Sequence, residues 1–196
     1  MKISSDRQKE IINVSIELIA QEGIQALTIK NISNRMGFTE PAIYRHFKDK
    51  MDICLHILDL FEESTKSLID NISKKEISRI DKIKMLFLEK CDNFSDNPAL
   101  ASVIFSEEIF RNEKLLAKRV ESIMKMNGAF ISKLIKEAQI KKEINSNIPT
   151  EHFAMIILGS LRLIVTKWRL SEFSFDLKKE SKALWTSLEK MIKFNI

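Results

Sequence analysis

The sequence predicts an all-α protein, and two observations support this fold class. Only 4 Gly and 3 Pro occur among 196 residues, so few residues interrupt helices. Apolar side chains recur at three- and four-residue intervals along most of the chain, as they do on one face of a helix. Hydrophobic residues make up 44% of the sequence, which is enough for the core of one or two small domains.

The first helix is expected over residues 6–22. Apolar side chains share one face of it, among them Ile12, Ile16 and Ile19. Gly23 follows at the position of a left-handed C-terminal cap. The apolar face indicates that this helix packs against other elements.

Two short helices follow in quick succession. Thr28 is a favourable N-cap for the second helix, and Gly37 ends it. The third helix, over residues 39–45, has Glu40 and Pro41 in its first turn, where both residue types are favoured. Two short helices around a glycine are typical of the helix-turn-helix motif.

Longer helices account for the rest of the chain. A fourth helix is capped by Asp49 and runs to about residue 72, and a fifth ends at the Asn97-Pro98 stop signal. Four more are expected over residues 99–110, 115–140, 150–168 and 177–191. No linker separates these helices, so we place the boundary near residue 50. The expected domains are a helix-turn-helix domain, residues 1–50, and a larger helical effector-binding and dimerisation domain, residues 51–196.

Residues 28–50 carry the functional prediction. This window holds five basic and two acidic side chains, in a chain of formal net charge +5. A short helix in a basic setting suits the major groove of duplex DNA, where base edges present distinguishable donors and acceptors. We expect base-facing side chains at its start and phosphate contacts beside it. The candidates for the groove are Thr39, Glu40, Pro41, Ala42 and Tyr44, and the candidates for phosphate contacts are Thr28, Tyr44, Arg45, His46, Lys48 and Lys50.

The run GFTEPAIYRHFKDK, from Gly37 to Lys50, resembles the signature of the TetR family of transcriptional regulators. Upstream positions that recur in the family also match, namely Arg7, Gly23, Thr28, Ile29 and Ile32. The resemblance implies that Thr28 contacts a phosphate and that Tyr44, His46 and Lys50 contact the DNA backbone. The positions that it implies to be base-facing are Thr39, Glu40, Pro41 and Ala42. It also implies that Ile43 and Phe47 pack the third helix onto the first two.

Other roles remain open for several of these residues. Tyr44 could pack its ring and leave its hydroxyl in water, and His46 could be a structural histidine at a turn. Glu40 could serve only the helix dipole rather than accept from a cytosine amino group. Arg45 and Lys48 could be solvated charges.

A single short helix buries too little surface for tight specific binding, so a homodimer on a pseudo-palindromic operator is expected. The last two helices carry wide apolar stripes that could form a four-helix bundle between two copies. Ordinary packing within one chain is the alternative. The expected interface residues are Leu161, Trp168, Leu184, Trp185, Leu188 and Met191.

The middle helices would surround a cavity for a small lipophilic effector in a protein of this family. Aromatic and thioether side chains supply a candidate lining, although plain core packing is the alternative. The candidates are Phe61, Phe87, Phe105, Phe110, Met124, Met126, Phe130 and Met155. Arg162 interrupts an apolar helix and could grip an anionic ligand, pair with a Glu across the dimer or extend to the surface.

Other functions have less support. His46, His56 and His152 are dispersed, and neither a nucleophile elbow nor a phosphate-binding glycine loop is present, so neither an enzyme nor a cofactor is expected. The effector is expected to release a repressor from its operator. Scattered segments, among them Asn97–Leu100 and Arg169–Phe173, faintly resemble the nucleoid-occlusion subgroup, which offers an alternative that acts through a protein partner.

The compartment also follows from the sequence. Cys54 and Cys91 lie far apart without metal-ligand spacing and are interpreted as buried, reduced thiols. The chain opens with no secretory signal, and its longest apolar stretch is too short to span a bilayer. We therefore expect a soluble cytoplasmic protein with no membrane partner.

Overall fold

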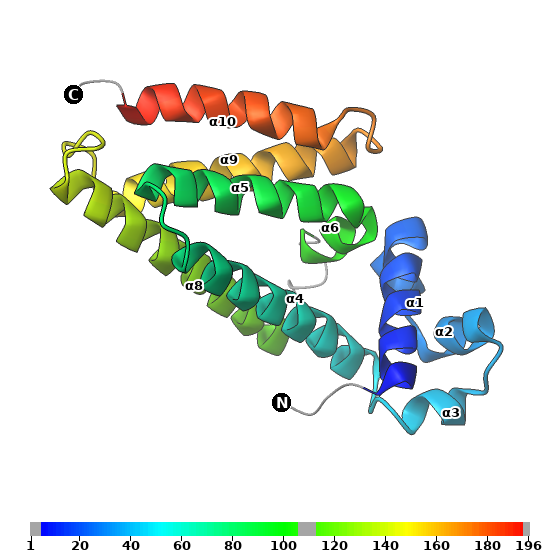
Figure 1. Cartoon of the computed structure of the whole chain (residues 1–196). Helices are drawn as coiled ribbons and strands as arrows, with labels where there is room; N and C mark the ends of the chain where they lie inside the picture. Colours follow the sequence, from blue (N-terminus) through cyan, green and yellow to red (C-terminus); the bar gives the residue numbers. More distant parts are fainter. Residues whose placement is uncertain (1–4, 106–112, 194–196) are drawn as a thin grey trace. The chain divides into compact units, whose positions relative to one another are not determined.

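The computed structural model describes residues 5–105 and 113–193 (Figure 1). Within these ranges the chain forms nine α-helices and a short 3-10 turn, with no strand, which confirms the predicted all-α class. The elements are α1 (Asp6–Glu22), η1 (Ile24–Ala26), α2 (Ile29–Met36), α3 (Glu40–Tyr44), α4 (Lys50–Ser73), α5 (Arg79–Asp96), α6 (Pro98–Ile104), α8 (Lys114–Ile140), α9 (Thr150–Leu170) and α10 (Leu177–Lys193).

The helices form two compact units that do not follow the linear order of the chain. The first unit contains residues Met1–Glu63 and Pro98–Val120, and the second contains Ser64–Asn97 and Glu121–Ile196. Two long helices, α4 and α8, contribute residues to both units. The first unit therefore contains the helix-turn-helix motif together with α6 and parts of α4 and α8.

One apolar core holds the first unit together. Side chains of α1, α2 and α3 meet the start of α4 there, and α6 packs on α1. Val103 from α6 and Leu116 from α8 are buried in the same core. Residues more than 50 positions after the end of the N-terminal motif thus complete its packing.

The second unit is built on α5, α9 and α10, which run side by side (Figure 1). Phe87 of α5 and Trp185 of α10 are each 1% exposed, and their ring centroids lie 5.6 Å apart. Burial of two such rings stabilises the packing of α5 on α10 by several kcal/mol, roughly 2–3 for each aromatic side chain.

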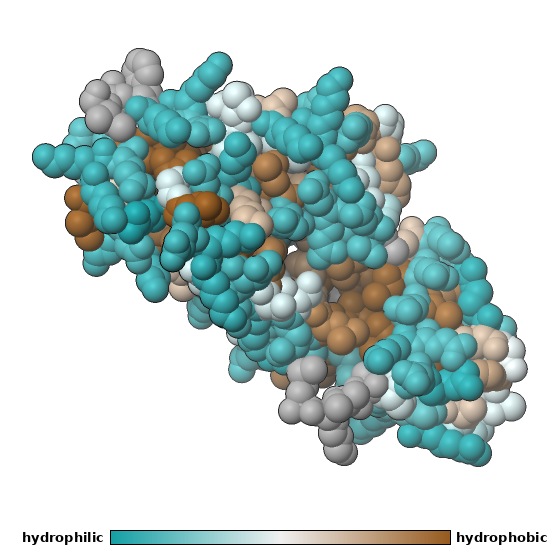
Figure 2. Space-filling view, viewed as in Figure 1, coloured by the Kyte–Doolittle hydropathy of each residue, from teal (hydrophilic) through white to brown (hydrophobic). Residues whose placement is uncertain are grey.

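Hydrophilic side chains cover most of the face of the protein shown in Figure 2.

The predicted caps are mostly confirmed. Thr28 Oγ1 accepts from the Asn31 amide at 3.0 Å at the start of α2, and Gly37 ends α2 in the left-handed conformation. Asp49 Oδ1 accepts from the Asp52 amide at 2.9 Å in the first turn of α4. These helix starts are predictable because the first backbone amides of a helix have no partner within it and need nearby acceptors.

Two details of the helix ends differ from prediction. Gly23 has a positive φ of 81° but a ψ of 174°, so it is extended rather than left-handed helical, because the chain turns directly into η1. Thr39 is the N-cap of α3 as expected, yet its side chain makes no capping hydrogen bond. Part of the helix expected over residues 99–110 lies outside the described residues.

No helix in the described ranges is long and apolar enough to cross a membrane. This agrees with the reading of the apolar stretch in α9.

Candidate DNA interface

The third helix has one buried and one exposed face. Ile43 is fully buried and Phe47, just after the helix, is 1% exposed, so both anchor α3 to the core of the first unit. Most of the predicted base-facing and flanking side chains lie on the opposite, solvent-accessible face. Thr39, Glu40, Pro41, Tyr44 and Arg45 are exposed, and Ala42 is half-buried. The burial of Ile43 and Phe47 follows the sequence prediction.

Thr28, another of the predicted phosphate contacts, is the N-cap of α2. Thr28 is half-buried, and its hydroxyl oxygen is used as a helix cap. The same hydroxyl still has its proton to donate. Asn31 also donates through its side chain to the Ala26 carbonyl at 2.9 Å, which holds η1 against α2. The local hydrogen bonds thus fix the start of α2 while Thr28 keeps a free donor.

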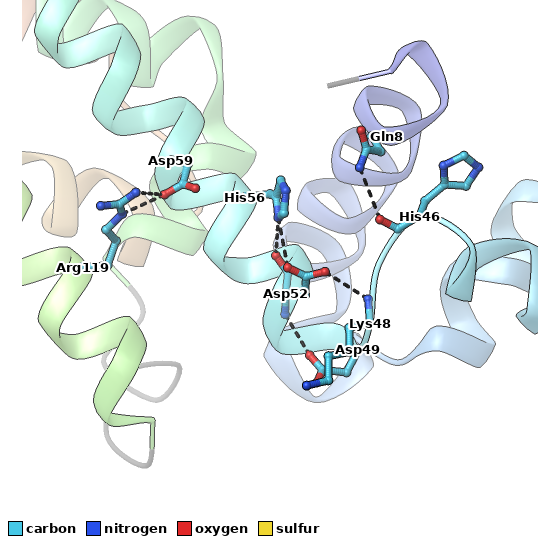
Figure 3. A network of polar contacts seen from close by, with 8 residues as sticks. All are labelled: Gln8, His46, Lys48, Asp49, Asp52, His56, Asp59 and Arg119. Carbon is cyan, nitrogen blue, oxygen red and sulfur yellow. Dashed lines mark hydrogen bonds and ion pairs between the residues drawn. The ribbon is translucent and has the colours of Figure 1, made fainter. Parts of the chain in front are cut away.

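The connection from α3 to α4 carries the expected phosphate contacts. Lys48 and Lys50 are exposed, and His46 is half-buried. The backbone amide of Lys48 donates to Asp52 Oδ2 at 3.0 Å, and His56 Nδ1 lies 2.8 Å from the Asp52 carbonyl oxygen (Figure 3). These contacts fix the backbone between the two lysines while their ammonium groups remain in solvent.

Arg35 belongs to the basic window but is held by α1. Its guanidinium donates to Glu22 at 2.8 Å and to Gln21 at 3.1 Å. This exposed ion pair contributes little stability, on the order of 0–1 kcal/mol. It does offset one of the five positive charges of the window, so Lys30, Arg45, Lys48 and Lys50 supply most of the positive field.

The predicted effector-binding residues are divided between the two units. Phe61 and Phe105 are buried in the first unit, whereas Phe87 is buried and Phe130 half-buried in the second. Met126 and Arg162 are half-buried in the second unit. Phe110 lies outside the described residues.

Two of the proposed lining residues do not lie in the interior of the chain. Met124 on α8 is 57% exposed, and Met155 on α9 is 70% exposed. The helical phase turns both side chains away from the buried faces, on which Ile123 and Ala154 lie. Neither methionine can therefore line an interior space within one copy of the chain.

The predicted interface residues also need correction. Leu161, Trp168, Trp185 and Leu188 are each at most 7% exposed within a single chain, so they already serve its own core. Leu184 is half-buried, and Met191 is 65% exposed. The alternative of packing within the chain is correct for the four buried residues, because α5, α9 and α10 all pack on one another.

A different face of α9 is exposed and apolar, and sequence reasoning missed it. Met155, Ile156, Leu163 and Leu170 are between 42% and 73% exposed. Gly159 lies in the same stretch of α9, and a Cβ atom built there would meet nothing within 4 Å. The available signal was that α9 is apolar on more than one side, which is typical of a helix covered on two faces.

The buried thiols are chemically quiet. Burial raises the pKa of Cys54 to about 11 and the pKa of Cys91 to about 12. A thiol with such a pKa holds almost no thiolate at neutral pH, which is the reactive form. Among the described residues, no three His, Cys, Asp or Glu side chains are grouped so that they could hold a metal ion.

The fold and this site define a helix-turn-helix DNA-binding regulator with a helical second part. The family model for bacterial regulatory proteins of the tetR family matches residues 11–57, and that of the YsiA-like protein C-terminal region matches residues 61–190. The chain belongs to the tetR family of bacterial regulatory proteins. This membership confirms the predicted DNA-binding transcriptional regulator and the prediction that the chain is not an enzyme.

Individual relatives are distant but span nearly the whole chain. The HTH-type transcriptional regulator AcrR of Shigella flexneri is 25% identical over 91% of this chain and 86% of its own length. The nucleoid occlusion factor SlmA of Vibrio atlanticus is 22% identical over 96% of this chain and 97% of its own length. Both likenesses extend well beyond the motif.

Solved structures share the fold at low identity. The fatty acid degradation regulator FadR from Bacillus halodurans has a TM-score of 0.82 at 21% identity, covering 96% of this chain and 97% of that one. FadR from Bacillus subtilis, solved in complex with stearoyl-CoA, has a TM-score of 0.77 at 21% identity, covering 94% and 98%.

Proposed function

We propose that this chain is a homodimeric repressor that reads a pseudo-palindromic operator with α3 and leaves it when a lipophilic effector binds. The observation that carries the proposal is the division of α3 into a buried anchor, Ile43, and an exposed face. A helix fixed on one side can present the other side to base edges in the major groove.

The roles of individual side chains follow from their exposure. Thr39, Glu40, Pro41 and Ala42 are proposed to face bases, because they lie on the first turn of α3, which enters the groove first. The phosphate contacts are assigned to a second set that flanks this turn. They are Thr28, Tyr44, Arg45, His46, Lys48 and Lys50. Tyr44 is 52% exposed, which supports a contact of its side chain with a partner outside the chain.

The homodimer is assigned to the exposed face of α9. Met155, Ile156, Leu163 and Leu170 form an apolar surface that a second copy can cover. An interface between identical chains is commonly two-fold symmetric, so α9 of one copy would meet α9 of the other. Gly159 would let the two helices approach closely. Two-fold symmetry would also present two copies of α3 to two half-sites.

A long-chain acyl thioester is the effector class to test first. FadR from Bacillus subtilis was solved with stearoyl-CoA, and it shares the fold of this chain over 94% of its length. Buried aromatic side chains, Phe87 among them, supply an apolar interior in the second unit. Arg162 is a half-buried cation on the same unit that could meet an anionic group.

The proposed release depends on two conformations of the protein that differ in the position of α4. Because α4 contributes residues to both units, an effector that prefers a displaced α4 would change the spacing of the two α3 helices. Helices that no longer fit successive major grooves lose specific affinity. The effector can shift DNA affinity only by its differential affinity for the two states.

The test is footprinting on the DNA upstream of the gene that encodes this chain, repeated with stearoyl-CoA, free stearate and CoA. Protection lost only with the acyl thioester supports the proposal. No protection of any segment at physiological salt would exclude operator binding.

A nucleoid-occlusion role is the second candidate, because the likeness to SlmA covers 96% of this chain. It predicts specific DNA binding that no lipophilic compound weakens and that recruits a division protein. The ligand arm of the footprinting experiment therefore separates the two functions.

A further inference from the structure

The two ends of the recognition helix are held by adjacent residues of α1. The helix α3 has only five residues, too few to be stable by themselves. Its position must therefore be set by contacts from elsewhere in the first unit. Ile43 and Phe47 hold its buried side, and α1 contributes two further contacts near its ends.

Arg7 contacts the residue that precedes the N-cap of α3. Its guanidinium carbon lies 4.7 Å from the centroid of the Phe38 ring, and the same group pairs with Glu10 one turn along α1. A guanidinium over a ring is attracted by the negative face of the π-system. The side chains of Arg7 and Glu10 are about half exposed, so the contact with Phe38 adds a modest restraint on the turn between α2 and α3.

Gln8 contacts His46, the second residue after the end of α3. Its Nε2 donates to the carbonyl oxygen of His46 at 3.3 Å, across 38 positions of sequence (Figure 3). Its Oε1 accepts from the Ser5 amide at 2.9 Å and so closes the capping box of α1. One amide side chain thus anchors the start of α1 and the end of α3, because it has both a donor and an acceptor.

We propose that Arg7 and Gln8 are positioning residues for DNA recognition, which hold α3 at both ends in the orientation that the groove requires. The proposal rests on the proposed role of α3 in reading bases. Base contacts need placement within a fraction of an ångström, whereas contacts of lysines with phosphates tolerate movement of the backbone. Loss of the contact made by either Arg7 or Gln8 should therefore reduce specific binding far more than non-specific binding.

The chain offers a matched substitution for Gln8. Gln8→Glu keeps the side-chain length and the acceptor that closes the capping box, since Glu and Gln both serve at this position. It removes the donor to His46 and places a carboxylate against a carbonyl oxygen. The capping box at the start of α1 is preserved, while the hydrogen bond to His46 is lost.

For Arg7 the comparison is Arg7→Ala with Arg7→Lys, which keeps the charge but loses the planar guanidinium. Lys9→Ala is the control, because Lys9 is exposed in the same turn and pairs only weakly with Asp6, at 3.5 Å. Each chain is titrated with the protected upstream fragment and with a scrambled duplex of equal length.

We expect Gln8→Glu and Arg7→Ala to lower the affinity for the protected fragment by about tenfold or more. Each substitution removes a contact with α3 in both copies of the dimer, and so affects both half-sites. Affinity for the scrambled duplex should change by less than about threefold, and Arg7→Lys should lie between Arg7→Ala and the unaltered chain. An equal loss on both duplexes would overturn the proposal, as would no loss on either.

Amide hydrogen exchange in the absence of DNA provides a second measurement. Gln8→Glu and Arg7→Ala should speed exchange in residues 40–47 while α5 and α10 keep their protection. Unchanged exchange in residues 40–47 would overturn the proposal even if no operator were found. Failure of the unaltered chain to protect any DNA would instead contradict the proposed function.

Discussion

The ammonium group of Lys90, on α5, donates a hydrogen bond of 3.2 Å to the hydroxyl oxygen of Thr65, on α4, and both side chains are buried in the second unit. Burial lowers the pKa of Lys90 from 10.5 to about 8. Burial of a charged group lowers the free energy of unfolding even when the group is hydrogen-bonded. The contact between Lys90 and Thr65 is therefore present in the second unit at a cost in stability.

The buried lysine predicts a specific pH dependence of stability. Between its folded pKa of about 8 and its unfolded pKa of 10.5, the unfolded chain binds more protons at Lys90, so the free energy of unfolding rises with pH. Relative to Lys90→Met, the unaltered chain should gain about 2 kcal/mol between about pH 7 and about pH 9.5. Urea denaturation of both chains at the two pH values measures this difference. A difference that stays constant, or falls, would show that Lys90 does not titrate in this range.

The two threonine N-caps of the motif should respond differently to substitution. Thr28 caps α2 through its hydroxyl oxygen, so Thr28→Ala should lower the free energy of unfolding by about 1 kcal/mol. Thr39 makes no capping hydrogen bond in α3, so Thr39→Ala should leave stability within about 0.5 kcal/mol but weaken operator binding. Thermal denaturation and operator titration are compared for both. Equal destabilisation by the two substitutions would refute the distinction.

Lys50 should contribute a phosphate contact. Its side chain is exposed beside α3, and the plot of log affinity against log salt concentration falls by about 0.9 for each phosphate neutralised. Lys50→Ala should therefore reduce the magnitude of the slope by about 1 for each half-site, with similar losses on all duplex sequences. Lys133→Ala, an exposed lysine of α8, serves as the control. An unchanged slope for Lys50→Ala would remove this residue from the interface.

The exposed face of α9 predicts a variant that separates association from folding. Leu163 is 69% exposed in the single chain, so Leu163→Glu should preserve helicity and shift dimers to monomers in sedimentation experiments. Trp185, which is 1% exposed, is the contrasting position. Trp185→Ala should lower the free energy of unfolding by about 3–5 kcal/mol. Persistence of the Leu163→Glu dimer would place the interface elsewhere.

Local features of the motif were predictable because they depend on neighbours in sequence. Thr28, Gly37 and Asp49 mark helix ends through hydrogen bonds or backbone conformations that span a few residues. The burial of Ile43 and Phe47 was predicted from the family resemblance. The all-α class was predictable from the same local preferences.

Features that depend on distant contacts were not predictable in this way. An apolar stripe on a helix identifies side chains that need cover, but it does not identify what covers them. Trp168 and Trp185 were therefore predicted at an interface, whereas they are buried within the chain, and the exposed stripe through Leu163 was missed.

The sequence by itself determined the helical class and most of the helix ends, because caps, glycines and periodicity act over one or two turns. It also contains the family signature by which the DNA-reading motif was recognised. Tertiary structure alone decided which apolar faces meet and that α6 completes the core of the motif. It also decided that Arg7 and Gln8 hold both ends of α3. These relationships join residues far apart in the chain, and only the folded backbone brings them within contact distance.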